Sequence, residues 1–167
     1  MITKIVPRAA AVVAIVLPAL AFNAYADRSE DREAIEALMW RYARALDGLN
    51  PDAYAAVFTE DGQFGVGEGA TKGHEALKKM IQGFIDNRKK REEEGNPAGP
   101  MFHMTADSWV EFIDATHARH HSYWQTAFGP AKRGEPVRIA AVGRGVDHLV
   151  KVKGKWLIQI RDVAPKD

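Results

Sequence analysis

The chain has 167 residues and a formal net charge of +1 at pH 7, because 23 lysines and arginines almost balance 22 aspartates and glutamates. A chain this close to neutrality lacks the basic surface with which proteins attract nucleic acid. It contains no cysteine, so disulfides, thiolate metal ligands and thiol nucleophiles are excluded.

The first 26 residues are predicted to be a secretory signal peptide. Lys4 and Arg8 precede an apolar run that is short for a membrane span, and Ala24-Tyr25-Ala26 offers the small residues that signal peptidase reads. An uncleaved anchor is the alternative, but Pro18 inside the run and the small-residue end favour cleavage after Ala26. We therefore expect a periplasmic or secreted protein, free of the membrane, with a formal net charge of −1.

The chain after residue 26 begins with a predicted amphipathic helix over residues 28–47. Its apolar side chains recur at three- and four-residue spacing, and Gly48 ends the pattern. Asn50 is suited to cap a second, short helix that begins at Pro51 and runs to about residue 58. The inward positions of the first helix are Ile35, Leu38, Met39, Tyr42 and Leu46.

Between residues 59 and 100 the pattern indicates turns and one further helix. A turn is expected at 59–62, and the glycine-rich segment 63–73 is at most a poor strand or hairpin. Residues 74–85 carry another apolar stripe at helical spacing. The charged segment 86–100 is either an extension of that helix or a solvated loop, because its charges largely cancel.

After Met101 the pattern changes to alternating segments separated by short turns, which is typical of antiparallel strands. Helices followed by consecutive strands predict a single α+β domain over residues 27–167, with helices packed on one face of a curved sheet. The predicted strands are 102–113, 117–128, 137–152 and 155–163.

Several segments, in their order and spacing, resemble the nuclear transport factor 2-like superfamily. They are "YARALD", "NPDAYAAVFTEDGQF", "KGHEALKKMI", a strand that carries a histidine, and "VDHLVKVKGKWLIQIRDV". Within that superfamily the chain is similar to the SnoaL-like branch with scytalone dehydratase and bile-acid dehydratase. The resemblance covers nearly all of residues 27–167. It implies a cone-shaped half-barrel of bent antiparallel sheet wrapped by N-terminal helices around a deep pocket.

The resemblance also bears on assembly and activity. It implies a homodimer or homotrimer. Members include dehydratases, isomerases, cyclases and epoxide hydrolases that use no cofactor, as well as non-catalytic binding domains. The fold alone therefore does not name the reaction.

The family's functional positions can be matched to this chain. The tyrosine and aspartate of the dehydratases' first helix match Tyr42 and Asp47, with the same five-residue gap. The pocket histidine matches His103, and the aspartate of the penultimate strand matches Asp147. The arginine of the last strand matches Arg161. The resemblance thus implies catalytic roles for Tyr42, Asp47 and His103, and substrate contacts for Asp147 and Arg161.

The middle strand, 117–128, has no clear match because its register is open. His120, His121, Ser122 and Tyr123 all lie near the expected place. The residues predicted to contact substrate from this strand are His121, Tyr123 and Trp124.

Two further positions limit the resemblance. The family often has a tyrosine two residues before the penultimate-strand aspartate, and here Gly145 stands there. The histidines of the middle strand also invite a metal site, but on a strand His117 and His121 share a face while His120 points away. Two imidazoles without a matched carboxylate are a weak zinc site, so no metal is predicted.

The chemistry of the matched residues suits acid–base catalysis. A carboxylate at Asp47 would fix the tautomer of His103, whose unperturbed pKa of about 6.5 suits a general base near neutral pH. A phenol at Tyr42, held in an apolar cavity, is a good donor to an oxygen that gains charge. Each residue also has a structural alternative: a core-edge tyrosine, a surface turn aspartate and a satisfied core histidine.

Arg161 closes the last predicted strand. Strict alternation places Trp156 and Ile158 on one face, and Gln159 and Arg161 on the other. Arg161 either forms an ion pair with Asp162 or Asp147 or holds a developing oxyanion.

These residues predict a cofactor-independent lyase that acts on a small hydroxylated hydrophobic or aromatic compound. Loss of water and retro-aldol loss of a small aldehyde both need this acid–base pair. An isomerase on the same scaffold and a non-catalytic periplasmic binding domain are the alternatives.

Overall fold

The computed structural model describes the backbone of residues 19–166 and the side chains of residues 28–166. The predicted signal peptide therefore lies outside the residues whose side chains are described. The described chain opens with the 29-residue helix α1 (Ala19–Asp47). Within the described range, no helix is both long and apolar enough to cross a bilayer.

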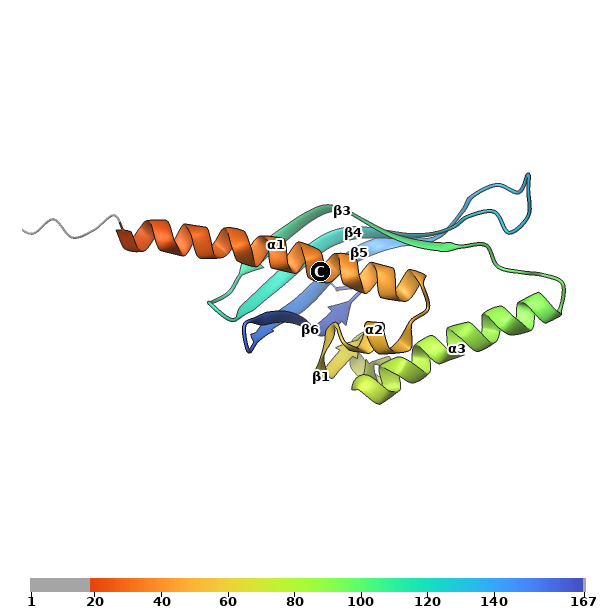
Figure 1. Ribbon diagram of the computed structural model, residues 1–167, viewed down its shortest axis with the longest axis horizontal. Helices are drawn as coiled ribbons and strands as arrows, with labels where there is room; N and C mark the ends of the chain where they lie inside the picture. Colours follow the sequence, from red (N-terminus) through yellow and green to blue (C-terminus); the bar gives the residue numbers. More distant parts are fainter. Residues whose placement is uncertain (1–18, 167) are drawn as a thin grey trace, which may run out of the picture.

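The rest of the described chain forms a single six-stranded sheet and three further helical segments (Figure 1). The strand order is β2-β1-β6-β5-β4-β3, and every neighbouring pair is antiparallel except β1 and β6. The remaining elements are α2 (Pro51–Ala55), β1 (Phe58–Phe64), the 3₁₀ turn η1 (Gly67–Gly69), β2 (Thr71–Lys72), α3 (His74–Glu93), β3 (Met101–Phe112), β4 (His117–Phe128), β5 (Arg138–Val152) and β6 (Lys155–Asp162). The predicted α+β class is confirmed.

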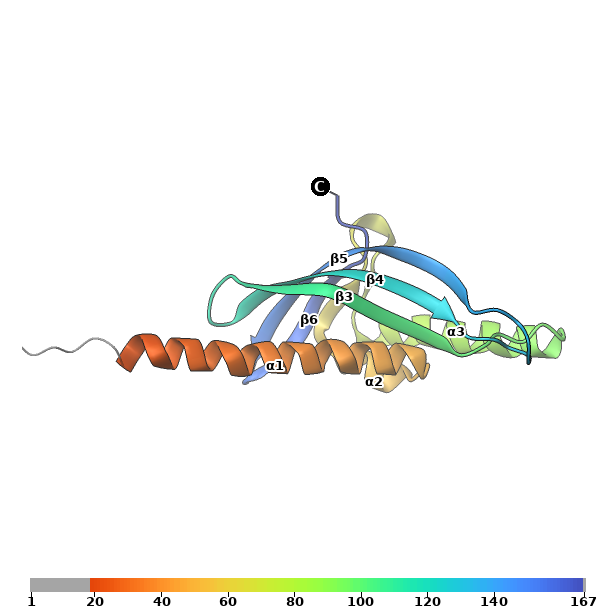
Figure 2. The ribbon, with the colours of Figure 1, turned by 90° about the horizontal axis from the view of Figure 1, so that it is seen from above.

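The sheet arches over α1 (Figure 2), and β-bulges contribute to that curvature. In β3 the two residues Asp107 and Ser108 oppose a single residue of β4. Ala140 is the extra residue of β5 against β4, and Gln159 is the extra residue of β6 against β5. Each bulge bends its strand and shifts the alternation of side chains beyond it.

The core lies between α1, α2, α3 and the concave face of the sheet. All five predicted inward residues of α1, from Ile35 to Leu46, are buried. Leu77 and Ile81 of α3 and Ile158 of β6 are fully buried as well. The helical spacing of these residues therefore predicted the packing face correctly.

The segment between α2 and α3 differs from its prediction. Residues 59–62, expected to be a turn, belong to β1. They form an irregular part of that strand, because Phe58 pairs with Ile158 while Gln63 pairs with Ile160. The turn-forming residues 59–62 therefore bulge out of the ladder without reversing the chain.

The structure also shows where the helices α2 and α3 begin and end. Asn50 caps α2 by accepting a hydrogen bond from the backbone N–H of Ala53 at 3.0 Å, as expected. The charged segment after residue 85 extends α3 to Glu93, which settles the choice that was open for its first half. Gly95 then leaves the helix with φ at 72°, a left-handed conformation that glycine adopts without strain.

Candidate active site

A cavity of about 230 Å³ lies between α1, α3 and the concave face of the sheet. Tyr42 and Leu46 of α1, His103 of β3 and Arg161 of β6 contribute to its lining. Phe84 of α3 lines it from the opposite side. With Trp124 of β4, four of the predicted site residues therefore meet around one chamber.

Asp47 holds His103 by two contacts. Its Oδ1 accepts hydrogen bonds from the backbone N–H of His103 at 2.9 Å and from Nδ1 of the ring at 2.7 Å. β3 is the edge strand of the sheet, so this backbone N–H has no ladder partner on that side. The predicted contact between Asp47 and His103 is confirmed.

This geometry sets the tautomer of the imidazole. A carboxylate only accepts hydrogen bonds, so Nδ1 carries the proton and Nε2 of the neutral ring keeps its lone pair. The two side chains are mostly buried, with 10% of Asp47 and 21% of His103 exposed. A histidine in this state can accept a proton from a molecule in the cavity.

Tyr42 lies between aromatic rings and a cation. Its ring centroid is 5.4 Å from that of Tyr54, and the guanidinium carbon of Arg161 lies 4.7 Å above its ring. Burial, reinforced by the neighbouring Tyr42 phenol, raises the pKa of Tyr54 well above its usual value. Tyr54 therefore stays neutral, and Arg161 is the charge that faces Tyr42.

Arg161 points to the opposite face from the one that strict alternation predicted. The bulge at Gln159 adds a residue to β6, so Arg161 turns inward together with Trp156 and Ile158. Burial alone would lower the pKa of Arg161, but the Asp147 carboxylate and the Tyr42 phenol raise it above its usual value. The guanidinium is thus a permanent buried cation.

Asp147 lies beneath the cavity and does not line it, which corrects its predicted substrate contact. Its side chain is fully buried, and its Oδ2 accepts hydrogen bonds from Nη1 of Arg161 and, at 3.1 Å, from Nδ1 of His120. The alternative of an ion pair between Arg161 and Asp147 is therefore confirmed. Asp147 orients the other two side chains from below.

The sequence left open which residues of β4 face inward, and in the structure His120 does. Because alternate residues face opposite ways, His121 and Tyr123 lie on the outer face of the sheet. His121 hydrogen-bonds Glu111 at 3.3 Å, and Tyr123 is 56% exposed. The prediction that His121 and Tyr123 line the pocket is wrong.

Trp124 does line the cavity, as predicted. Its Nε1 donates hydrogen bonds to the backbone oxygens of Arg144 at 2.9 Å and Val163 at 3.1 Å, so the indole lies flat across β5. A Cβ added at Gly143 would come within 2.6 Å of this ring, and one at Gly145 within 3.4 Å. The indole therefore occupies the space into which a tyrosine at position 145 would project.

Beneath the cavity, polar atoms with no hydrogen-bond partner gather in one place. Among the described side chains, the buried atoms without a partner are Tyr54 OH, Ser122 Oγ, Asp147 Oδ1 and Arg161 Nε. Three of the four belong to residues on or next to the Tyr42–Arg161–Asp147 network, and Ser122 pairs with Gly145, two residues before Asp147 on β5. Buried polar groups normally have a hydrogen-bond partner, so a group of buried donors and acceptors without one is typical of a functional site.

Two residues of this site, Tyr54 and His120, were missing from the predicted set. Tyr54 lies in the short helix predicted from residue 51, and nothing in that segment indicated that its phenol lies in a polar network. His120 was among the open candidates, and no local pattern separated it from His121. Only the pairing of His120 with Asp147 across the β4–β5 ladder shows which one faces inward.

The three histidines of β4 do not converge. His117 hydrogen-bonds Asp114 on the exposed β3–β4 turn, and His121 and His120 lie on opposite faces. Within the described residues, no group of three or more histidine, aspartate or glutamate side chains could hold a metal ion.

Comparisons with known proteins bear on the fold. A structure of Rv3472, a protein of unknown function from Mycobacterium tuberculosis, superposes with a TM-score of 0.68 at 23% identity and covers 85% of this chain and 75% of that chain. An NTF2-like protein with a cystatin-like fold from Novosphingobium aromaticivorans gives a TM-score of 0.71 at 20% identity, over 90% and 91% of the two chains.

A third structure carries a functional name. It is a protein of Novosphingobium aromaticivorans named as a candidate scytalone dehydratase, with a TM-score of 0.65 at 25% identity, over 83% of this chain and 85% of that chain. No curated protein sequence matches the chain significantly. The SnoaL-like domain family matches residues 27–162, which is most of the chain. The chain therefore belongs to the family of SnoaL-like domains, with an NTF2-like α+β fold.

Proposed function

We propose that the protein is a cofactor-independent lyase that acts on a small hydroxylated hydrophobic or aromatic compound. The SnoaL-like family includes polyketide cyclases and dehydratases, and its members are often enzymes. The observation that carries the proposal is His103, held by Asp47, on the wall of a cavity that Tyr42 and Arg161 also line.

In a dehydration, Nε2 of His103 takes a proton from carbon, and the electron pair of that C–H bond forms a carbon–carbon double bond. The C–O bond breaks as Tyr42 donates its proton, so the hydroxyl leaves as water. Asp47 stabilises the imidazolium, and the Arg161 cation stabilises the Tyr42 phenolate. Proton return from His103 to Tyr42 restores both residues.

A retro-aldol cleavage would use the same groups in another order. His103 removes the proton of a hydroxyl, the adjacent carbon–carbon bond breaks, and a small aldehyde leaves. The electron pair on the remaining carbon is then protonated by the imidazolium. The name of the similar Novosphingobium protein favours dehydration over aldehyde loss.

The proposal is tested by incubating the purified protein with hydroxylated aromatic compounds and following product mass. Substitution His103→Ala should lower turnover by about a hundredfold or more, because general base catalysis is worth at least that much. His121→Ala is the matched control, since its ring lies on the outer face of the same sheet and should leave turnover unchanged.

The outcomes separate the candidates. A product lighter than its substrate supports a lyase, and a product of unchanged mass supports an isomerase on the same scaffold. Binding of these compounds without conversion would support a non-catalytic binding domain. Equal loss of turnover in His103→Ala and His121→Ala would contradict the assignment of His103 as the base.

A further inference from the structure

A second cavity, of about 210 Å³, adjoins the candidate active site. Phe84 of α3 and Met101 at the start of β3 line both cavities, so the two share a wall. The second cavity continues outward between α3 and the chain segment that leads into β3. A molecule that occupied both cavities would therefore lie against Phe84 and Met101.

The charged side chains that line the two cavities are all arginines. Arg161 lines the inner cavity, together with the neutral base His103, and Arg88 and Arg91 line the outer one. No aspartate or glutamate is among the lining residues of either, although acidic and basic residues are nearly equal in number over the whole chain. Cavities whose only charged lining residues are cations attract an anionic ligand.

Three of these bases already have partners. His103 is held by Asp47, and Arg161 is paired with Asp147. Arg91 donates hydrogen bonds to the backbone oxygen of Asn96 at 3.2 Å and to its Oδ1 at 3.4 Å.

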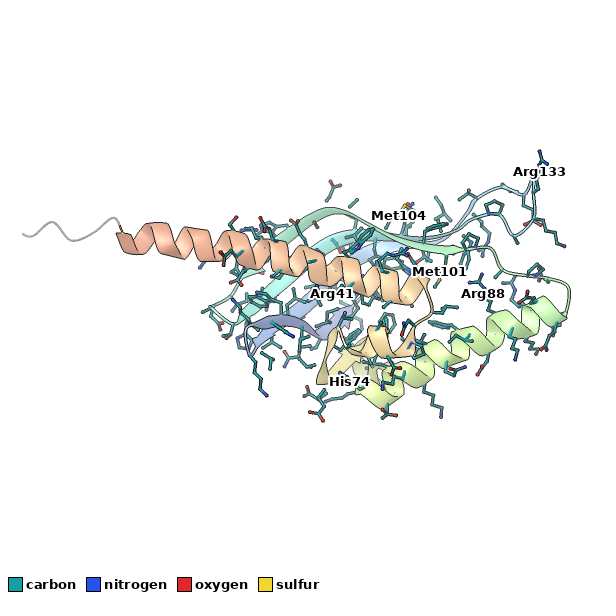
Figure 3. The ribbon with its side chains drawn as sticks, in the orientation of Figure 1. Arg41, His74, Arg88, Met101, Met104 and Arg133 are labelled. Atoms are coloured by element: carbon teal, nitrogen blue, oxygen red, sulfur yellow. The ribbon has the colours of Figure 1, made fainter. Side chains whose placement is uncertain are left out.

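Arg88 is the exception. Within residues 28–166 it has no hydrogen-bond or ion-pair partner. It lies one helical turn beyond Phe84 and one before Arg91, so these three share a face of α3. Figure 3 shows Arg88 close to Met101 in the space between α3 and β3, where both line the outer cavity.

We infer that Arg88 binds the carboxylate of a hydrophobic substrate whose hydroxylated end reaches His103. A guanidinium offers a planar pair of donors that matches a carboxylate, and the apolar wall of Phe84 and Met101 fits the body of the molecule between the two ends. The inference rests on the proposed function, since it places the ligand in the same chamber. It names the substrate class as a hydroxylated aromatic or hydrophobic carboxylic acid.

The test compares biphenyl-4-carboxylate with its uncharged methyl ester by isothermal titration calorimetry. The wild-type protein should bind the acid about tenfold more tightly than the ester, which is the worth of one charge-assisted hydrogen bond. Arg88→Gln should lose this preference while its affinity for the ester is unchanged. Arg88→Lys, which keeps the charge, should retain part of it.

Arg133→Gln is the matched control. Arg133 lies at the tip of the β4–β5 connection (Figure 3) and lines neither cavity, so its substitution should leave the preference intact. The inference is overturned if wild-type protein binds the acid no more tightly than the ester or binds neither, or if Arg88→Gln keeps the preference. A protein that prefers the acid through Arg88 but converts no compound would contradict the proposed lyase and leave this inference standing.

Discussion

Asp147 links two side chains that the sequence left in separate roles. Its carboxylate lies between the guanidinium of Arg161 and the imidazole of His120, and all three side chains are almost completely buried. Arg161 in turn lies over the ring of Tyr42, whose phenol is the proposed proton donor. A single carboxylate beneath the cavity therefore positions the cation that faces the chemistry.

Substitution Asp147→Asn should destabilise the fold by about 3 kcal/mol or more, because removing one partner leaves the charge of Arg161 buried and uncompensated. Urea unfolding near neutral pH measures the loss. Asp86→Asn is the control, since Asp86 is an exposed carboxylate that hydrogen-bonds only Gln82, and its effect should be about 0.5 kcal/mol or less. Equal losses in the two variants would show that Asp147 does not stabilise Arg161.

At the scale of strands and helices, sequence patterns predicted well wherever the period was unbroken. The inward stripe of α1 followed helical spacing, so Tyr42 was placed correctly. Strict alternation wrongly separated Arg161 from the face of Trp156, because the bulge at Gln159 reverses the alternation and a bulge depends on pairing with a distant strand. His121 and Tyr123 were misplaced for a related reason, since alternation alone does not say which face of β4 meets the helices.

The site itself was predictable only in part. Asp47 and His103 were paired through a resemblance to known enzymes, and no local pattern in either segment indicated their contact. In the network below the cavity, the Arg161–Asp147 pair was among the alternatives, but the place of His120 could not be predicted, because it depends on the register between β4 and β5. Registers of this kind are set by contacts between segments far apart in the sequence.

The packing of Trp124 across β5 makes a prediction for its glycines. Gly143→Ala should destabilise the protein by about 1 to 3 kcal/mol, because the new Cβ would lie 2.6 Å from the indole and force it to move. Tryptophan fluorescence and urea unfolding would both report the change. Gly69→Ala is the matched control, since an added Cβ there meets nothing within 4 Å. If Gly143→Ala lowered the free energy of unfolding no more than the control does, that result would contradict this packing.

At the scale of the whole molecule, α1 connects two distant parts of the sheet. Near its beginning, Asp31 accepts hydrogen bonds from Nζ of Lys151 at 2.6 Å and Nε1 of Trp156 at 2.7 Å, both in the β5–β6 hairpin. At its end, Asp47 holds His103 on the edge strand β3. Export after cleavage at Ala26 and assembly into a homodimer or homotrimer remain predictions from the sequence.

The anchor at Asp31 makes the stability of the fold depend on pH. Burial raises the pKa of Asp31, but the hydrogen bonds from Lys151 and Trp156 outweigh it and lower the pKa below the ordinary 3.8. A lowered pKa in the folded state stabilises the protein above pH 3.8 and loses that contribution as the pH falls through the folded value.

Asp31→Asn should therefore cost about 1 to 2 kcal/mol near neutral pH, and the difference from wild type should shrink as the pH falls below 3.8. Urea unfolding at several pH values measures this difference. If the difference in unfolding free energy between the two proteins stayed constant down to the acid range, titration of Asp31 would be excluded as its cause.

Gly143 and Gly145 of β5 leave room for the indole of Trp124, which lines the cavity from the neighbouring strand. The size of the side chain at position 124 therefore affects the space inside the cavity. Replacing Trp124 with a smaller side chain would lengthen the space available to a ligand without altering the Asp47–His103 pair, which stands on a different strand and helix.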